Sequence, residues 1–194
     1  SSVSPVLGLD FGTTFASIAC AVGDKVYLIP DEKGRLLQPS VVSYPQGGLP
    51  LAGHEAREKL ITDPRRTVAS CKRLLGKPFN DPQIIGYLKS SAYKAVEGPD
   101  GSIVIEIDGK EYSVIQLASL VIAHLKGIAE RQLHRDFREV VLTMPVGFTD
   151  HQEQALRKAA KLAGLNVMLT LTEPLAGAMC YSHGQSKNEI TAVF

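Results

Sequence analysis

The sequence predicts an α/β protein built on a mixed β-sheet with helices on its faces. Short apolar runs separated by turn residues open the chain, and long apolar stripes at helical spacing fill its second half. Continuous apolar runs, typical of strands that are buried on both faces, alternate with those stripes. Strands and helices that alternate in this way form crossover units. Such units place parallel strands beside the antiparallel strands at the beginning of the chain.

The composition is that of one globular domain or two small lobes. The 194 residues carry 21 basic and 20 acidic side chains, so no charge excess points to nucleic acid or an anionic membrane. Aromatic residues make up 6% and tryptophan is absent, which argues against base stacking. Three scattered cysteines in apolar surroundings predict buried thiols of a reducing compartment. Without a membrane-length apolar run or a signal peptide, we expect a cytoplasmic protein, or an organellar one whose targeting segment has been removed.

The first part of the chain predicts an antiparallel meander. An apolar run from Val6 ends at Asp10, and the next apolar runs, 18–22 and 26–29, are separated by a Gly-Asp turn pair. A polar loop and an extended segment at 39–44 follow.

The middle of the chain is harder to interpret. A short helix is predicted at 53–60, and an Asp-Pro start with apolar residues at helical spacing predicts a second helix at 63–76. Residues 77–100 mix Pro, Asn and Gly with weak periodicity, and we expect them to form a surface excursion.

The next segment predicts a hairpin, a long helix and a buried strand. An Asp-Gly turn centres the hairpin at 103–112, and a capping box formed by Ser113 and Gln116 begins a helix that continues to Leu133. The apolar run 140–144 is the predicted strand, which Pro145 ends.

The last segment continues the alternation. A second capping box predicts a helix at 149–163, followed by a strand at 167–171, a helix from 172 to about 183 and a strand at 190–194. The whole order is that of a ribonuclease-H-like fold, with a mixed five-stranded sheet flanked by helices.

The turn after the first strand is the first candidate site. Gly12 lets the backbone approach a ligand, and successive N–H groups beside the hydroxyls of Thr13 and Thr14 form a cup suited to phosphate. Asp10 at its edge is suited to magnesium, held directly or through water. The alternative is an ordinary hairpin that Asp10 caps.

Polar residues also follow two later apolar strands, at Pro145 and at Thr172-Glu173. In sheets of this class, ligands bind where strand ends meet and the strand order reverses. The three positions together therefore favour a binding site at one edge of the sheet.

Six motifs in order carry a resemblance to a known family. They are 8–15 (GLDFGTTF), Gly34-Arg35 with Pro39-Ser40, Thr67-Val68 with 72–76 (KRLLG), Val140-Val141 through Met144-Pro145 to Phe148, 163–167 (AGLNV), and Glu173-Pro174. This pattern resembles the nucleotide-binding domain of the heat-shock protein 70 (DnaK-type) chaperones, within the actin and sugar-kinase superfamily. The resemblance covers the whole chain.

The resemblance implies an actin-like ATPase that binds ATP or ADP with magnesium. The cofactor-binding residues would be Asp10, Gly12, Thr13, Thr14, Phe15 and Lys72. Asp10 would hold magnesium through water. Lys72 would reach the γ-phosphoryl group and the attacking water, and Glu173 would position that water, so these two would be the catalytic residues. Without the family, Lys72 would be a solvated helix residue and Glu173 a first-turn acid facing the helix dipole.

Departures from the family pattern concern the allosteric switch. Pro145 would report the nucleotide state to the peptide-binding half, but Glu153 stands where the family usually has a basic residue, and Gly147 replaces a common aromatic. We therefore expect a divergent member in which nucleotide binding is better preserved than allosteric coupling. The alternatives are a non-hydrolysing regulatory or ribosome-associated cochaperone, and a sugar or metabolite kinase, against which Lys72 and Glu173-Pro174 argue.

The same resemblance assigns residues 1–194 to lobe I of the nucleotide-binding domain. Lobe II, the interdomain linker and the peptide-binding domain are expected outside this chain. The implied partners of the full-length ATPase are J-domain cochaperones, nucleotide-exchange factors and unfolded polypeptides, with no nucleic acid and no membrane. No enzymatic activity is assigned to the 194 residues alone.

Overall fold

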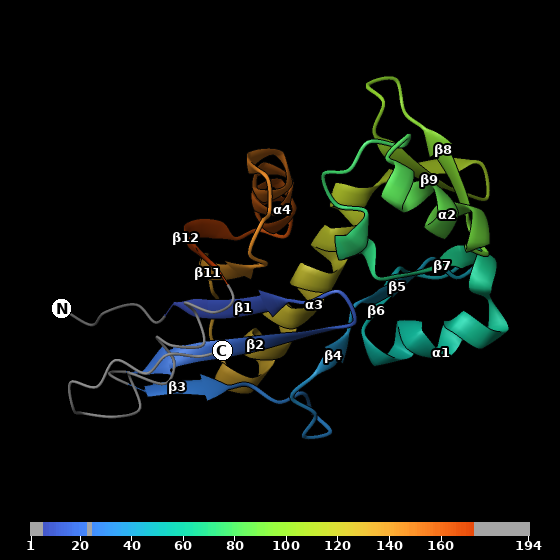
Figure 1. The fold of residues 1–194 in the computed structure, drawn as a ribbon. Coiled ribbons are helices and arrows are strands. Elements are labelled where there is room, and N and C mark those ends of the chain that lie inside the picture. The colour runs from blue at the N-terminus through green and yellow to red at the C-terminus, as the bar shows by residue number, and fades with distance from the viewer. Residues whose placement is uncertain (1–5, 23–24, 173–194) are drawn as a thin grey trace.

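A mixed β-sheet forms the centre of the fold, as the sequence predicts. The structure, a computed structural model, describes residues 6–22 and 25–172. Its main sheet has the strand order β12-β11-β1-β2-β3, and a short strand, β4, also pairs with β2 (Figure 1). The six strands are β1 (Leu7–Phe11), β2 (Phe15–Val22), β3 (Lys25–Leu28), β4 (Gln38–Pro39), β11 (Glu139–Met144) and β12 (Asn166–Thr172).

Strand direction divides this sheet into two halves. β2 pairs antiparallel with β1 and β3, whereas β11 pairs parallel with both β1 and β12. The carboxyl ends of β1, β11 and β12 therefore lie at one edge, with Asp10 opposite Thr143 and Met144 opposite Thr172. This is the edge at which the sequence places its polar turn and Pro145.

Two helices cover one face of the main sheet. α3 (Val114–Leu133) packs on β2, α4 (Asp150–Leu162) packs on β12, and the two helices contact each other. Both begin with the predicted capping boxes. Alternate residues of β1 are buried on the helix side, so the neighbouring Asp10 points to the opposite, exposed face.

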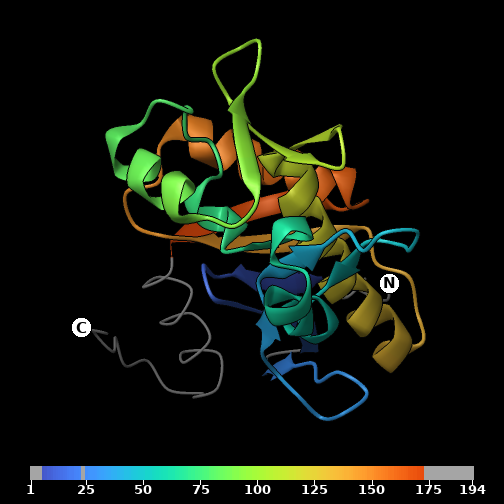
Figure 2. The ribbon, with the colours of Figure 1, turned by 90° about the vertical axis from the view of Figure 1, so that its right-hand side faces the viewer.

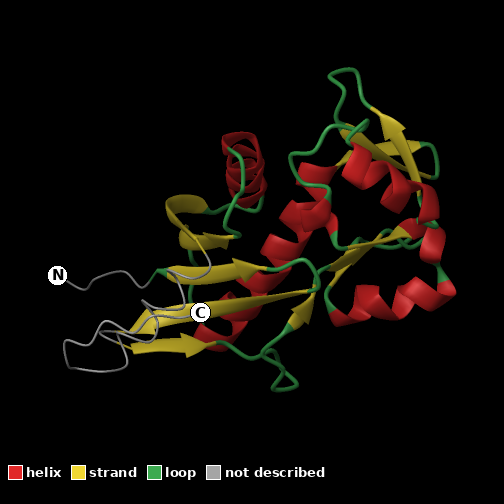
Figure 3. Ribbon diagram, viewed as in Figure 1, coloured by secondary structure: helices red, strands yellow, loops and turns green. Residues whose placement is uncertain are grey.

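Two small sheets form the second part of the molecule, to the right of the main sheet in Figure 1. α3 is long enough to contact the main sheet and both small ones (Figure 3). One sheet has the order β6-β5-β7 and the other β10-β9-β8, whose β8–β9 connection projects from the molecule in Figure 2. The elements are β5 (Val41–Ser43), β6 (Leu51–Ala52), α1 (His54–Thr62), β7 (Thr67–Ala69), α2 (Pro82–Ser90), β8 (Lys94–Glu97), β9 (Ile103–Ile107) and β10 (Lys110–Ser113).

The predicted helix at 63–76 is wrong. A 3₁₀ turn at Pro64–Arg66, the strand β7 and a second 3₁₀ turn at Cys71–Arg73 take its place. β7 pairs with β5, and Ser70 adopts the left-handed conformation at φ 56°, which breaks any helix. Tertiary pairing of β-branched residues thus overrides an apolar spacing that also suits a helix.

The surface excursion predicted for 77–100 is also corrected. It contains α2, whose N-cap Asp81 accepts a hydrogen bond from the backbone N–H of Gln83, and β8, which pairs with β9. Ile84 and Tyr93 from this segment are buried in the core.

Some predictions lie outside the described residues: the helix from 172 to about 183 beyond its first residue, which belongs to β12, the strand 190–194, Glu173 and Cys180. Cys20 and Cys71 are buried free thiols, as predicted. Within residues 6–22 and 25–172, none of the helices has the length and apolar character needed to cross a membrane.

Candidate functional site

Asp10 lies at the carboxyl end of β1 with a defined hydrogen-bond partner. The hydroxyl of Thr143, on the neighbouring strand β11, donates a 2.8 Å hydrogen bond to Oδ1 of Asp10. The carboxylate is exposed, so its other oxygen is accessible to a ligand or a hydrated ion. The hydrogen bond orients the carboxylate at the sheet edge.

The turn from Gly12 to Phe15 is tight, and only glycine fits at its first position. A Cβ atom on Gly12 would lie 2.2 Å from the carbonyl oxygen of Phe15. Thr14 and Phe15 are exposed, so the turn presents its backbone and side chains to solvent. These are the properties that the sequence predicts for a phosphate-binding cup.

Ser40 stabilises this turn through two hydrogen bonds. Its hydroxyl donates to the carbonyl oxygen of Gly12 at 2.8 Å, and its backbone N–H donates to the carbonyl oxygen of Thr14 at 2.9 Å. Ser40 is fully buried, so both bonds are protected from water.

Ser40 also connects the turn to the segment that carries Lys72. The backbone N–H of Ser70 donates to the carbonyl oxygen of Ser40 at 3.0 Å, and the 3₁₀ turn Cys71–Arg73 follows directly. Lys72 is only 4% exposed, and its Nζ lies 5.7 Å from the ring centroid of Phe148, in a cation–π contact. Phe148 lies in the connection after β11, so Lys72 contacts the segment that Pro145 begins.

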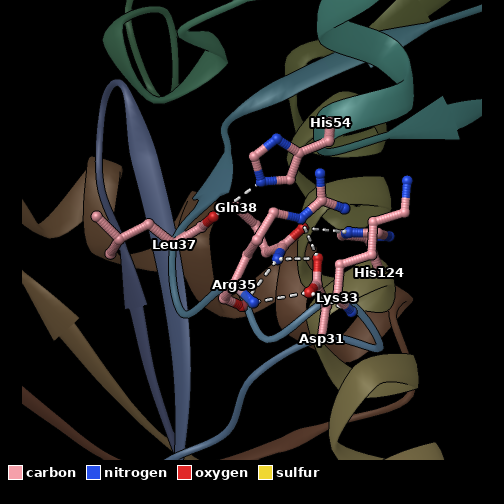
Figure 4. A network of polar contacts seen from close by, with 7 residues as sticks. All are labelled: Asp31, Lys33, Arg35, Leu37, Gln38, His54 and His124. Atoms are coloured by element: carbon pink, nitrogen blue, oxygen red, sulfur yellow. Dashed lines mark hydrogen bonds and ion pairs between the residues drawn. The ribbon is translucent and has the colours of Figure 1, made fainter.

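A buried polar network supports the loop before Ser40 (Figure 4). The carboxylate of Asp31 accepts hydrogen bonds from the backbone N–H groups of Lys33 and Arg35, from Arg35 Nε and from Gln38 Nε2. Although burial opposes ionisation, these hydrogen bonds hold the pKa of Asp31 well below its usual range.

Gln38 connects this network to α3. Its amide Nε2 donates to Asp31, so its Oε1 faces Nε2 of His124 at 3.1 Å as an acceptor. His124 must therefore carry its proton on Nε2 when neutral. Gln38 begins β4, which pairs with Phe15 and Ala16 of β2, so the network fixes the strand that borders the cup.

Glu153 faces away from these residues. It lies in the first turn of α4 and accepts hydrogen bonds from Thr170 on β12 at 2.9 Å and from Nε of Arg157 at 3.0 Å. The Thr170 hydroxyl and then the Arg157 guanidinium lower the pKa of Glu153. The acidic residue is thus neutralised within its own chain.

The predicted site residues fall into two groups. The cup 12–15, Asp10 and Lys72 are connected through Ser40 and the sheet edge, and Pro145 follows the adjacent strand β11. Glu153 belongs to the α4–β12 contact instead, and Glu173 lies outside the described residues.

The donors present fit a hydrated magnesium ion at Asp10. In the described part of the chain, no three His, Cys, Asp or Glu side chains gather into a cluster that would hold a bare metal ion. A single exposed carboxylate beside a phosphate-binding turn suits magnesium that keeps most of its waters.

The mixed sheet of this strand order, with a glycine turn and a carboxylate at its carboxyl edge, agrees with the actin-like ATPase fold that the following family match implies. The family model described as Hsp70 protein matches residues 6–194. The chain is also 35% identical over 189 residues to the potato (Solanum tuberosum) protein "Heat shock 70 kDa protein, mitochondrial". The chain belongs to the Hsp70 family, and its matched part is the family's nucleotide-binding domain. The alignment covers 97% of this chain and 28% of the relative.

Proposed function

We propose that these residues form lobe I of a chaperone ATPase, which binds ATP and hydrolyses it to ADP and phosphate. The observation that carries the proposal is the connection through Ser40, which ties the cup at 12–15 to the turn that carries Lys72. Phosphoryl transfer needs positioned charge more than covalent chemistry, and this connection positions a cation relative to a backbone cup.

Each residue has one proposed role. The backbone N–H groups of Thr13, Thr14 and Phe15 and the hydroxyls of the two threonines bind the β- and γ-phosphates. Lys72 stabilises charge on the γ-phosphoryl group. Asp10 holds the waters of magnesium, which supplies further neutralisation of phosphate charge when bound. Glu173 positions the attacking water.

We extend this proposal to the activity of the full-length protein. We place nucleotide-controlled binding of unfolded polypeptides, J-domain cochaperones and nucleotide-exchange factors in the full-length protein, with Pro145 as the switch. The compartment is the cytoplasm or an organelle, and the potato relative, which is named as mitochondrial, supports an organelle.

The test is single-turnover ATP hydrolysis by the full-length protein. Lys72→Ala should lower the hydrolysis rate at least about a hundredfold, because an electrostatic contribution to the transition state is lost, and should keep much of the nucleotide affinity. Lys89→Ala, at the exposed end of α2, is the matched control and should hydrolyse ATP normally. Unchanged hydrolysis in Lys72→Ala would contradict the assignment.

A second candidate is a regulatory chaperone that binds ATP without turning it over. The pairing of Glu153 with Arg157 favours it, because a side chain already neutralised within the lobe is poorly placed to transmit nucleotide state to another domain. Hydrolysis measured with and without a J-domain protein separates the two. Stimulated turnover supports the first candidate, and tight ATP binding without turnover supports the second.

A further inference from the structure

A cavity of about 500 Å³ lies beside the segment that carries Lys72. Its walls come from four segments that are far apart in sequence: residues 74–78, the β8–β9 connection, the start of α3 and the first turns of α4. Its volume is within the range of small-molecule sites, roughly 300–1,000 Å³. None of the proposed nucleotide-binding residues lines it.

The interior of the cavity is apolar. Leu74, Ile103, Val114 and Ala155 are buried core residues that also line it, and the partly buried Ile115 lies beside them. Such a surface binds the apolar body of a ligand by removing it from water.

The rim of the cavity is basic. Lys77, His151 and Lys158 line it, and Lys77 also forms an ion pair with Asp81 at 3.5 Å, whereas the one acidic residue of the lining is Asp100. Asp100 keeps its negative charge, which the two lysines outnumber, and its Oδ1 accepts hydrogen bonds from the hydroxyl of Ser102 at 2.5 Å and from the Ser102 backbone N–H at 3.2 Å. These hydrogen bonds, with a smaller effect of His151, lower the pKa of Asp100.

The start of α3 adds partial positive charge to the same rim. Val114 and Ile115 are the first two residues of α3, whose first turn carries no acidic side chain, whereas the first turn of α4 carries Asp150 and Glu153. The N–H groups of a first helical turn have no partner within the helix and favour an anion nearby. The basic side chains, the start of α3 and the apolar interior thus favour an anion with an apolar body.

We propose that this cavity is an accessory binding site for a small amphiphilic carboxylate, with an apolar body held inside and an acidic group held at the basic rim. The site is separate from the nucleotide cup but mechanically close to Lys72. Gly76, which lines the cavity, is so close to α4 that a Cβ atom on it would lie 2.7 Å from Cα of Gln152. The lining residue Leu74 directly follows the turn that carries Lys72, and α4 begins two residues after Phe148.

The test uses 2-naphthoate as the probe and 2-naphthamide as its uncharged counterpart, titrated into the chain and followed by fluorescence. Saturable binding of naphthoate is expected, weakened about three- to tenfold by Lys158→Glu, because one attraction becomes a repulsion at an exposed site. Lys161→Glu, on the same helix but outside the cavity, should bind as the original chain does. The amide should bind about threefold or more weakly than the acid.

Amide NMR shifts locate the probe independently of the variants. Shifts at Gly101, Val114 and Ile115 support the proposal. Shifts confined to Gly12–Phe15, an amide that binds as tightly as the acid, or identical binding by Lys158→Glu and the original chain would each overturn it. Because the readout needs neither ATP nor turnover, its outcome is separate from that of the proposed function.

Discussion

At the scale of single residues, the cup could be predicted because its motif is local, whereas its supports could not. Asp10 and Gly12 stand two positions apart, so their spacing is visible in the sequence. The hydroxyl that orients Asp10 comes from Thr143, 133 positions later, and depends on the parallel pairing of β1 with β11. Ser40 belongs to the motif Pro39-Ser40, which the sequence shows. Its two hydrogen bonds to the turn are visible only in the folded structure.

Gly12→Ala should disrupt the cup. Because a Cβ atom would lie 2.2 Å from the Phe15 carbonyl oxygen, the turn must shift, at a cost of about 1–3 kcal/mol in unfolding free energy. Full-length protein carrying it should bind ATP at least about tenfold more weakly by calorimetry. Gly86→Ala in α2 is the control, since nothing lies within 4 Å of its added Cβ, and it should be stabilised by up to about 1 kcal/mol. Equal ATP affinities in both variants would disprove a role for the turn.

His124 should make the stability of the chain depend on pH. Burial, and to a lesser extent Arg131, lowers the pKa of His124 in the folded state, whereas in the unfolded chain it titrates near about 6.5. The neutral ring therefore stabilises the fold fully above that pH. This contribution is lost as the pH falls from there through the lower folded-state pKa, with a slope of at most about 1.4 kcal/mol per pH unit.

The measurement for His124 is urea unfolding between pH 7.5 and pH 5. His124→Gln retains a donor toward Gln38 but does not titrate, so its unfolding free energy should fall less on acidification. His151→Gln, at an exposed position, serves as the control and should follow the original chain. If His124→Gln shows the same pH slope as the original chain, the buried ring is not the cause.

At the scale of elements, secondary structure was predicted correctly where a single sequence signal was dominant. The capping boxes at the starts of α3 and α4 fixed both helices, and their apolar stripes fixed the buried faces. It failed at 63–76, because residues of β7 and the following 3₁₀ turn repeat at a spacing that also suits a helix. The deciding interaction there is pairing with β5, which is invisible in a single sequence.

The stability that the α4–β12 contact contributes should depend on the signs of the charges at positions 153 and 157. Glu153→Arg places a second cation beside Arg157 and removes the acceptor for Thr170, so we expect a loss of about 1 kcal/mol, seen as a lower midpoint in thermal melts. The double variant Glu153→Arg with Arg157→Glu restores an ion pair between the two positions with the charges exchanged. It should recover part of the lost stability. Because both side chains are partly exposed, the effect should shrink at high salt. A double variant no more stable than the single one would show that the pair is not the source.

At the scale of the whole molecule, our proposed assignment to lobe I makes the site one half of a nucleotide cleft. The cup, Asp10 and Lys72 all belong to the edge formed by the carboxyl ends of β1 and β11 and the turns packed against them. The family resemblance places a second phosphate loop and the adenosine pocket in another lobe, and this chain spans 28% of the length of the potato relative. A fold can thus be complete in its core while its ligand contacts are shared with a further domain.

The chain by itself should therefore bind ATP weakly and hydrolyse it at a negligible rate. One lobe supplies phosphate contacts from one side only, so most of the positioning that catalysis requires is lost. Calorimetric titration of the 194-residue chain should give a dissociation constant weaker than about 100 µM, whereas the full-length protein, measured in the same buffer with magnesium, should bind far more tightly. Micromolar or tighter binding by the chain alone would mean that the cup, Asp10 and Lys72 form a sufficient nucleotide site, and the division of the site between two lobes would have to be abandoned.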